Sequence, residues 1–288
     1  MRAYRVAYDG RPFHGFQRQP AVDTVADALL DALADLDVTD GDERVPDDWA
    51  AAGRTDAGVS AVAQTVAFEA PEWLTPRAFN SALPGSVRVW ASADAPAAFH
   101  ATHDATRRRY RYHLHAPDAD ADAAKTAAKA LSGEHDFHNL TPDETGTVRD
   151  LDVTVRAGDD GGESASGVAS EEFLVVDVAA GGFARQLVRR LMSVVAAVAT
   201  GAAGLDRVDR VLASAPLDGP AGVAPALPEP LVLLDVAYGD SDLAFAVDER
   251  ARESALAALA ERRVDALRSA RATGTMLRAL SAAGSAEE

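Results

Sequence analysis

A carboxylate held between an arginine and two glycines is the clearest candidate for chemistry in this chain. Residues 53–61 read Gly-Arg-Thr-Asp-Ala-Gly-Val-Ser-Ala, a short loop between two apolar, strand-like stretches. Gly53 and Gly58 allow the backbone conformations of a tight bend. Arg54 carries the opposite charge and would favour the ionised form of Asp56. Asp56 is therefore a candidate nucleophile. The alternative is an ordinary surface turn, in which Asp and Gly are common.

Arginines and tyrosines alternate along a second segment. Residues 107–114 are typical of a strand, with Tyr110 and Tyr112 on one face and Arg107, Arg109 and Arg111 on the other. An aromatic face can stack on a base that has left its helix. A strand tyrosine belongs more often to the core, and we assign Tyr112 to it.

A third candidate segment runs from Gly182 to Thr200 and has apolar residues at helical spacing. Arg185 and Arg189 lie one turn apart on its other side, opposite Leu187, so both could reach a cleft. A charge run on a helix is, however, more often its solvated side.

Metal and cofactor signatures are missing from the sequence. The histidines form three close pairs, without a third ligand at a characteristic spacing: His100/His103, His113/His115 and His135/His138. His135 is interpreted as structural. Phosphate-loop and dinucleotide fingerprints are absent, so we expect neither a metal site nor a cofactor.

Six spaced blocks of sequence fit together as one pattern. They are residues 8–10 with 13–20, the Asp56 loop, Asn80–Pro84, Phe99–Ala101 with Arg108–Tyr112, Gly133–Phe137, and Phe183–Arg190. In type and order they resemble the motifs of the tRNA pseudouridine synthases of the TruA family, over residues 4 to about 239. Three departures stand out: Ser60 replaces the usual His, Phe16 the usual Trp, and Thr102-His103-Asp104 a more basic Arg-Phe-Ser.

The resemblance implies a cofactor-independent isomerase that converts uridine to pseudouridine at positions 38 to 40 of the tRNA anticodon stem-loop. It implies a homodimer as well. Asp56 would be the nucleophile, attacking ribose C1′ or base C6. Arg54 would position the RNA and aid extrusion of the nucleotide, Tyr110 would hold the base, and Arg189 would pair with Asp56. Further RNA contacts are expected from the arginines of the strand and from these three residues: Arg185, Gln17 and Arg18.

Composition sets independent limits. With 288 residues, 48% of them hydrophobic, the chain can build one large domain or two average ones. It has no cysteine, so a disulfide framework is excluded. No signal-peptide core and no apolar run near the roughly 18 residues of a membrane span are present. We expect a cytoplasmic protein that does not contact membranes.

The net charge of the chain at first argues against nucleic-acid binding. There are 45 acidic and 28 basic residues, a net −17, where a basic surface is usual for RNA binding. Only Lys125 and Lys129 are lysines, a pattern that suits the salt-rich cytoplasm of a halophilic archaeon; GC-rich coding is the alternative. At molar salt the Debye length is roughly 3 Å, so acidic residues hardly repel RNA. Recognition would then depend on shape, bidentate arginine and stacking.

Hydrophobic periodicity predicts an α+β fold. It favours two sheet-and-helix halves, separate or sharing one sheet, with mixed, mainly antiparallel strands flanked by helices. The family resemblance implies the same arrangement, with the active site in the cleft between the halves. The predicted parts are an N-terminal domain (1–104) with the Asp56 loop, a second α+β domain (105–246) and a helical extension (247–288). Strands are expected near 4–8, 64–68, 87–92, 106–116, 148–156, 173–180 and 231–238. Helices are expected near 22–36, 76–83, 121–131, 183–200 and 205–214, and a mobile hairpin loop at 158–172.

Two rival functions remain open at this point. An RNA chaperone could keep the fold without the chemistry, although the presence of Asp56 speaks against it. A glycosidase-like hydrolase would need two carboxylates about 5 to 10 Å apart. Glu69 and Asp9 are candidates for the second carboxylate, and their spacing favours neither.

Overall fold

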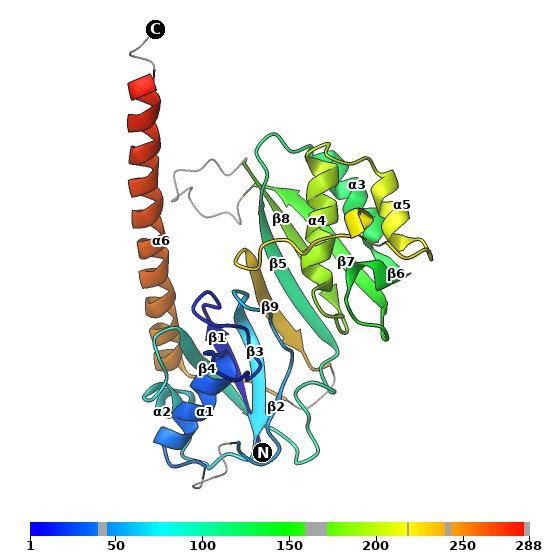
Figure 1. Cartoon of the computed structure of the whole chain (residues 1–288). Coiled ribbons are helices and arrows are strands. Elements are labelled where there is room, and N and C mark those ends of the chain that lie inside the picture. The colour runs from blue at the N-terminus through cyan, green and yellow to red at the C-terminus, as the bar shows by residue number, and fades with distance from the viewer. Residues whose placement is uncertain (40–44, 159–171, 218, 240–242, 285–288) are drawn as a thin grey trace.

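A single mixed sheet of ten strands organises the molecule (Figure 1). The computed structural model describes residues 1–39, 45–158, 172–217, 219–239 and 243–284. Along the sheet the order is β10-β4-β1-β3-β9-β5-β8-β7-β6, and β2 pairs with β3. Only the β3–β9 pairing is parallel among the described strands. The predicted α+β class, with its mainly antiparallel sheet, is confirmed.

The strands follow the expected pattern closely. Their bounds are β1 (Arg2–Tyr8), β2 (Ala50–Ala51), β3 (Ser60–Phe68), β4 (Val87–Asp94), β5 (Arg107–His115), β6 (Gly133–Asp136), β7 (Val148–Ala157), β8 (Phe173–Ala180), β9 (Leu231–Ala237) and β10 (Ala246–Val247). β3 begins four residues before the predicted start at Gln64. The short strands β2, β6 and β10 were not predicted, because two to four residues carry too little periodicity.

The first half of the sheet packs on α1 (Val25–Asp35) and α2 (Pro76–Asn80). Each helix starts at a threonine whose hydroxyl accepts a backbone N–H, Thr24 from Asp27 and Thr75 from Ala78. Beneath them lies an aromatic cluster, in which the Tyr4 ring stacks on Phe68 at a centroid distance of 5.3 Å. These contacts fix the half that carries Asp56.

The second half packs on α3 (Ala121–Leu131), α4 (Leu187–Ala199) and α5 (Asp206–Leu212). Two short 3-10 helices belong to the same half of the chain: η1 (His138–Leu140) precedes β7, and η3 (Gly219–Ala221) follows α5. α4 begins four residues later than the predicted start at Phe183. Gln186 precedes it with φ of 60°, a left-handed conformation that cannot continue a helix backwards. Arg185 therefore lies before the helix and not on it.

Strand β9 joins the two halves. It runs parallel to the start of β3 at Ser60 and Ala61 and antiparallel to β5 on its other side. The halves therefore share one sheet, with β9 at its centre. The predicted domain limits at 104/105 and 246/247 stay predictions.

After β9 the chain returns to the far edge of the first half. β10 pairs with β4 there, and the 36-residue helix α6 (Glu249–Gly284) follows (Figure 1). Among the described residues, no helix is both long enough and apolar enough to cross a membrane. The predicted hairpin loop falls almost entirely on residues 159–171, outside the described residues.

Candidate active site

The Asp56 loop connects β2 to β3 and is held by the N-terminal segment. The backbone N–H of Phe16 donates to the Thr55 carbonyl at 3.0 Å. The Thr55 hydroxyl in turn shares a 2.8 Å hydrogen bond with the buried Tyr8 phenol. Tyr8 and Thr55 are both buried. Thr55, which directly precedes Asp56, is therefore held through its backbone and through its side chain.

Glycine is needed in this loop for two different reasons. Gly58 has φ of 83°, a conformation that other residues rarely adopt. A Cβ placed on Gly10 would lie 2.0 Å from the Val59 carbonyl oxygen, so only glycine allows this approach. Ser60 secures the same contact by accepting the Gly10 N–H at 3.0 Å. Gly53 shows neither a positive φ nor a close neighbour, which makes its predicted role in the bend wrong.

Asp56 and Arg189 meet across the two halves. Nη1 of Arg189 lies 2.8 Å from Oδ2 of Asp56, and the side chains are 14% and 30% exposed. Nε of Arg189 donates to the Ala226 carbonyl at 2.8 Å, so the guanidinium is oriented on two sides. The Asp56 carboxylate is thus held in place by Arg189, and its side chain remains partly exposed to solvent.

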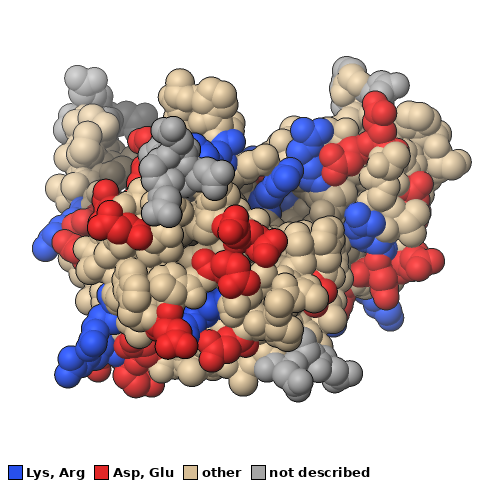
Figure 2. All heavy atoms as spheres, turned by 90° about the horizontal axis from the view of Figure 1, so that it is seen from below, with Lys and Arg blue, Asp and Glu red and all other residues tan. Residues whose placement is uncertain are grey.

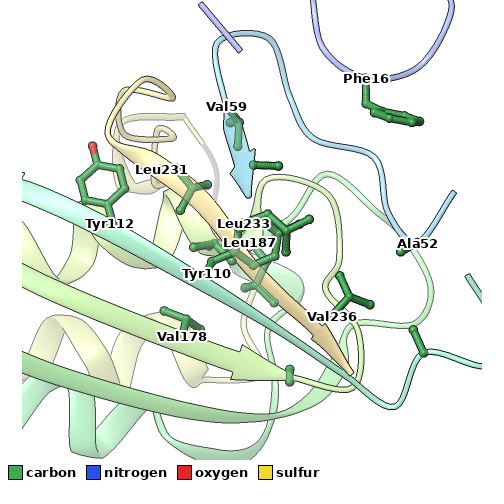
Figure 3. Close-up of a cluster of buried hydrophobic side chains, with 14 of the residues drawn as sticks. Phe16, Ala52, Val59, Tyr110, Tyr112, Val178, Leu187, Leu231, Leu233 and Val236 are labelled. Atoms are coloured by element: carbon green, nitrogen blue, oxygen red, sulfur yellow. The ribbon is translucent and has the colours of Figure 1, made fainter. Parts of the chain in front are cut away.

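Tyr110 lies beside this pair. Its ring is 9% exposed, contacts Phe183 edge to face at 5.2 Å, and packs with Leu187 and Leu233 (Figure 3). Burial raises the pKa of the Tyr110 phenol to about 12, helped by the charge of Asp56 and opposed by Arg108. The phenol is therefore neutral at physiological pH. Tyr112 is buried in the core, as expected.

The surroundings of Asp56 form a wide cleft of about 1280 Å³ between the halves. Most of the sequence-predicted site residues line it, and they are Gln17, Arg18, Arg54, Asp56, Tyr110, Arg185 and Arg189. Arg54 is exposed and makes no ion pair or side-chain hydrogen bond within the described ranges. Arg18 donates to Asp27 at 2.9 Å, and Arg185 lies 3.3 Å from Asp143.

Three predicted RNA contacts do not reach the cleft. Arg107, Arg109 and Arg111 lie on the face of β5 opposite to Tyr110, as their alternation requires. Arg111 binds Asp177 through Nε at 2.7 Å, and Arg107 binds Asp152 at 2.9 Å. These three arginines therefore do not line the Asp56 cleft, and their contact with RNA stays a prediction.

Arg108 is the arginine of β5 that lines the cleft, where Arg107, Arg109 and Arg111 had been expected. It lies on the Tyr110 face of β5, is buried, and lines the cleft. Its guanidinium donates to four carbonyls, those of Ala52, Thr102, Ala105 and Gly181. Burial lowers its pKa. Sequence reasoning missed this residue, although the same period-two alternation assigns it to the aromatic face.

Asp143 is the second carboxylate that lines the cleft among the described residues. It accepts the Arg185 backbone N–H at 2.7 Å. The two carboxylates considered from sequence lie elsewhere. Asp9 is buried against Arg11, and Glu69 pairs with the N-terminal amine at 3.2 Å. Neither lines the cleft.

The departures from the expected motifs have local structural roles. Phe16 is buried, with its ring 6.3 Å from that of Tyr8. The Thr102 hydroxyl donates to the Ala51 carbonyl at 2.5 Å, and Asp104 accepts the His100 N–H at 2.8 Å. This segment thus supports the start of the Asp56 loop.

No group of three or more His, Cys, Asp or Glu side chains is placed to hold a metal within the described residues. His135 hydrogen-bonds the Ser132 carbonyl at 3.0 Å, which fits its structural interpretation. Acidic and basic side chains are interspersed over the face seen in Figure 2.

Comparison with known proteins gives consistent results. A family model described as "tRNA pseudouridine synthase" matches residues 127–239. A protein of Haloarcula marismortui named "tRNA pseudouridine synthase A" is 56% identical over 281 residues, covering 94% of this chain and 97% of that protein. The protein of the same name from Natronomonas pharaonis is 55% identical, covering 96% and 98%. A chain in a solved Cbf5-Nop10-Gar1 complex is 13% identical, with a TM-score of 0.36 over 81% of this chain and 49% of that one.

Proposed function

The chain belongs to the tRNA pseudouridine synthase family, and from this premise we propose that it isomerises uridine to pseudouridine at positions 38 to 40 of the tRNA anticodon stem-loop. It would do so without a cofactor. The observation that carries the proposal is the ion pair of Asp56 with Arg189 beside the Tyr110 ring, within one cleft.

The reaction conserves every atom of the nucleotide. Asp56 attacks either ribose C1′ or base C6, and the glycosidic bond to N1 breaks. The uracil then turns, C5 bonds to C1′, and the bond between Asp56 and the nucleotide breaks, which frees the carboxylate. C5 gives up its proton and N1 ends protonated. Arg189 holds the attacking carboxylate in place and compensates its charge while the cleft is occupied by substrate.

A base inside a helical stem must leave the stack before Asp56 can reach it. The cleft offers Tyr110 to contact the extruded base, and its phenol stays protonated because of its burial. Arg54 has no partner within the described ranges, so it is available to bind a phosphate or to fill the position that the base has left. Gln17, Arg18 and Arg185, which line the same cleft, would contact the flanking nucleotides.

We also propose where the enzyme works and in which oligomeric state. The relatives that are 55 to 56% identical come from halophilic archaea, and the acidic, lysine-poor composition suits a cytoplasm at molar salt. We place the protein in that cytoplasm. A homodimer is proposed from the family resemblance alone.

The test is pseudouridine formation in an unmodified tRNA transcript at molar KCl, read at single-nucleotide resolution. The wild-type protein should modify positions 38 to 40, and Asp56→Asn should give no product while binding tRNA normally. Asp143→Asn, which removes the other cleft carboxylate, serves as the matched control and should retain activity. Product from Asp56→Asn would refute its role as nucleophile, and tRNA binding without product from the wild type would favour the RNA chaperone.

A hydrolase is kept as the second candidate, because Asp143 provides another carboxylate in the cleft. A hydrolytic reaction would release free uracil and leave an abasic site. Chromatography of the same reactions separates the two outcomes. Uracil release that is lost in Asp143→Asn would favour the hydrolase over the isomerase.

A further inference from the structure

Helix α6 begins on the body of the protein and ends away from it. Ala251 and Ala255 in its first turns are buried, and Arg262 lies 3.7 Å from the buried carboxylate of Asp9. From there the helix continues to Gly284, about 33 Å further at 1.5 Å per residue. This stretch, residues 262–284, stands clear of both halves (Figure 1) and is here called the arm.

The arm carries charge of the opposite sign to the rest of the protein. It has five arginines and one aspartate, a net +4, in a chain whose total is −17, so all other residues together carry −21. Those other residues include the two terminal glutamates, Glu287 and Glu288.

Three of the arginines form a single row. Arg263, Arg271 and Arg278 follow at intervals of eight and seven residues, which at 100° per residue keeps them on one face over about 22 Å. None has a carboxylate partner in the described part of the chain, whereas Arg268 pairs with Asp265. Unpaired guanidinium groups in a protein with 45 acidic residues indicate an anionic partner outside the chain.

The root of the arm lies next to the Asp56 loop. Asp9, which Arg262 approaches, precedes Gly10, and the Gly10 backbone touches Val59 on that loop. A polyanion bound at Asp56 is therefore close to the start of the arm. The guanidinium fork suits phosphate oxygens.

A second copy of the chain fits the arm less well. Positions alternating by four and three residues from Leu256 onwards include Leu267 and Leu277, but also Arg263 and Gly274. A charged residue and a glycine in the seam do not favour a coiled coil. The charge thus points to nucleic acid.

We propose that the arm binds the tRNA phosphate backbone outside the anticodon stem-loop, through Arg263, Arg271 and Arg278. This inference rests on the proposed function, because it takes tRNA as the ligand of the Asp56 cleft. It adds a contact that selects whole tRNA over an isolated stem-loop.

The experiment compares two triple variants of the full chain. Arg263→Gln/Arg271→Gln/Arg278→Gln removes the row. Arg77→Gln/Arg210→Gln/Arg252→Gln removes the same charge from exposed arginines outside the arm. The Kd of full-length tRNA and of an isolated anticodon stem-loop is measured by anisotropy across a KCl series.

For the arm variant we expect tRNA binding to weaken about 10-fold at the lowest KCl, and the slope of log Kd against log[KCl] to fall by roughly 2 to 3, about 0.9 per lost phosphate contact. Stem-loop binding and turnover should stay as in the wild type, and the control variant should bind tRNA normally. Equal losses in both variants, or equal losses on both RNAs, would overturn the proposal.

Light scattering on the same samples tests the second copy as occupant. A lower molar mass of the arm variant with an unchanged salt slope would assign the arm to a subunit contact and reject RNA. The binding readout does not depend on catalysis. If the wild type bound tRNA with the expected arm dependence and made no pseudouridine, the proposed reaction alone would fail.

Discussion

Arg108 binds the Ala52 carbonyl with two nitrogens at once, Nε at 3.0 Å and Nη2 at 2.7 Å. Ala52 lies four residues before Asp56, while the other carbonyls bound by Arg108 belong to segments that enter β5 and leave β8. One buried guanidinium therefore connects the Asp56 loop to the chain leading towards Arg189. It positions the two partners of the central ion pair without touching either.

Replacement of Arg108 should separate positioning from substrate binding. In Arg108→Met the buried carbonyls lose their donor, which should lower the free energy of unfolding by about 2 to 4 kcal/mol. In Arg108→Lys one or two of the bonds remain, so we expect a folded enzyme with kcat reduced at least 10-fold and a nearly unchanged KM. Single-turnover kinetics and urea unfolding measure the two effects. A normal kcat in a folded Arg108→Lys protein would contradict the positioning role.

Loss of Arg189 should slow turnover strongly while leaving the fold intact. Arg189→Met removes the cation that orients Asp56, and we expect kcat to fall by roughly 10²- to 10³-fold, as for loss of one preorganised charged contact. Arg185→Met is a suitable control, because this exposed arginine lines the same cleft and does not touch Asp56. Similar losses in both variants would indicate that RNA binding, and not the ion pair, limits the reaction.

The hydroxyl and the ring of Tyr110 can be tested apart. Tyr110→Phe keeps the edge-to-face contact with Phe183 and should retain activity within a few-fold, whereas Tyr110→Ala opens a cavity and loses the ring on which a base could rest. Pseudouridine formation under single-turnover conditions measures both. Equal activity of the Ala and Phe variants would exclude contact with the base.

Burial of Tyr110 also predicts a pH dependence at the alkaline end. Its pKa is about 12 in the folded protein against about 10 in an unfolded chain, so its contribution to stability is complete below pH 10 and is lost as the pH rises through 12. The Tyr110→Phe variant should therefore lose stability less steeply between pH 10 and 12. Urea unfolding over this range tests it, and parallel curves for both proteins would refute it.

Gly10, which touches the Asp56 loop, and Gly53, which lies in it, should differ sharply in their tolerance of alanine. Gly10→Ala forces a Cβ into the Val59 carbonyl and should displace the loop, with a large loss of activity. Gly53→Ala meets nothing within 4 Å and should behave as the wild type. Activity and melting temperature of the pair decide the matter. An inactive Gly53→Ala would show that this residue matters for RNA and not for the fold.

Much of the architecture follows from periodicity. The helix α3 and the strand β8 have the predicted bounds. Asp120 caps the start of α3, and the apolar run of β8 stands out from the residues around it, so both patterns show where the element begins and ends. The start of α4 was predicted four residues early, since helical spacing of apolar residues cannot show that Gln186 adopts a positive φ. Pairing of β9 with both β3 and β5 is a long-range contact that no local pattern records.

The residues of the candidate site were predictable from the sequence only in part. Motif resemblance placed Asp56, Arg54, Tyr110 and Arg189 on one cleft, and the structure brings them there. The arginines of β5 were assigned by charge, when the alternation of the strand separates them from Tyr110. The alternation assigns Arg108 to the face of Tyr110, but it does not show its carbonyl partners, which lie up to 73 residues away. The contact of Asp143 with Arg185 is likewise a long-range contact that no local pattern records.

The central place of β9 has a consequence for synthesis on the ribosome. Its residues are translated after strands β1 to β8, yet they lie beside Ser60, directly after the Asp56 loop. The Ala226 carbonyl that orients Arg189 also comes from this late segment. A nascent or prematurely terminated chain that ends between residue 189 and the start of β9 at Leu231 therefore has every charged residue of the cleft but lacks the strand that joins the two halves. We therefore expect activity only after translation has passed Asp56 by about 180 residues and Arg189 by about 50.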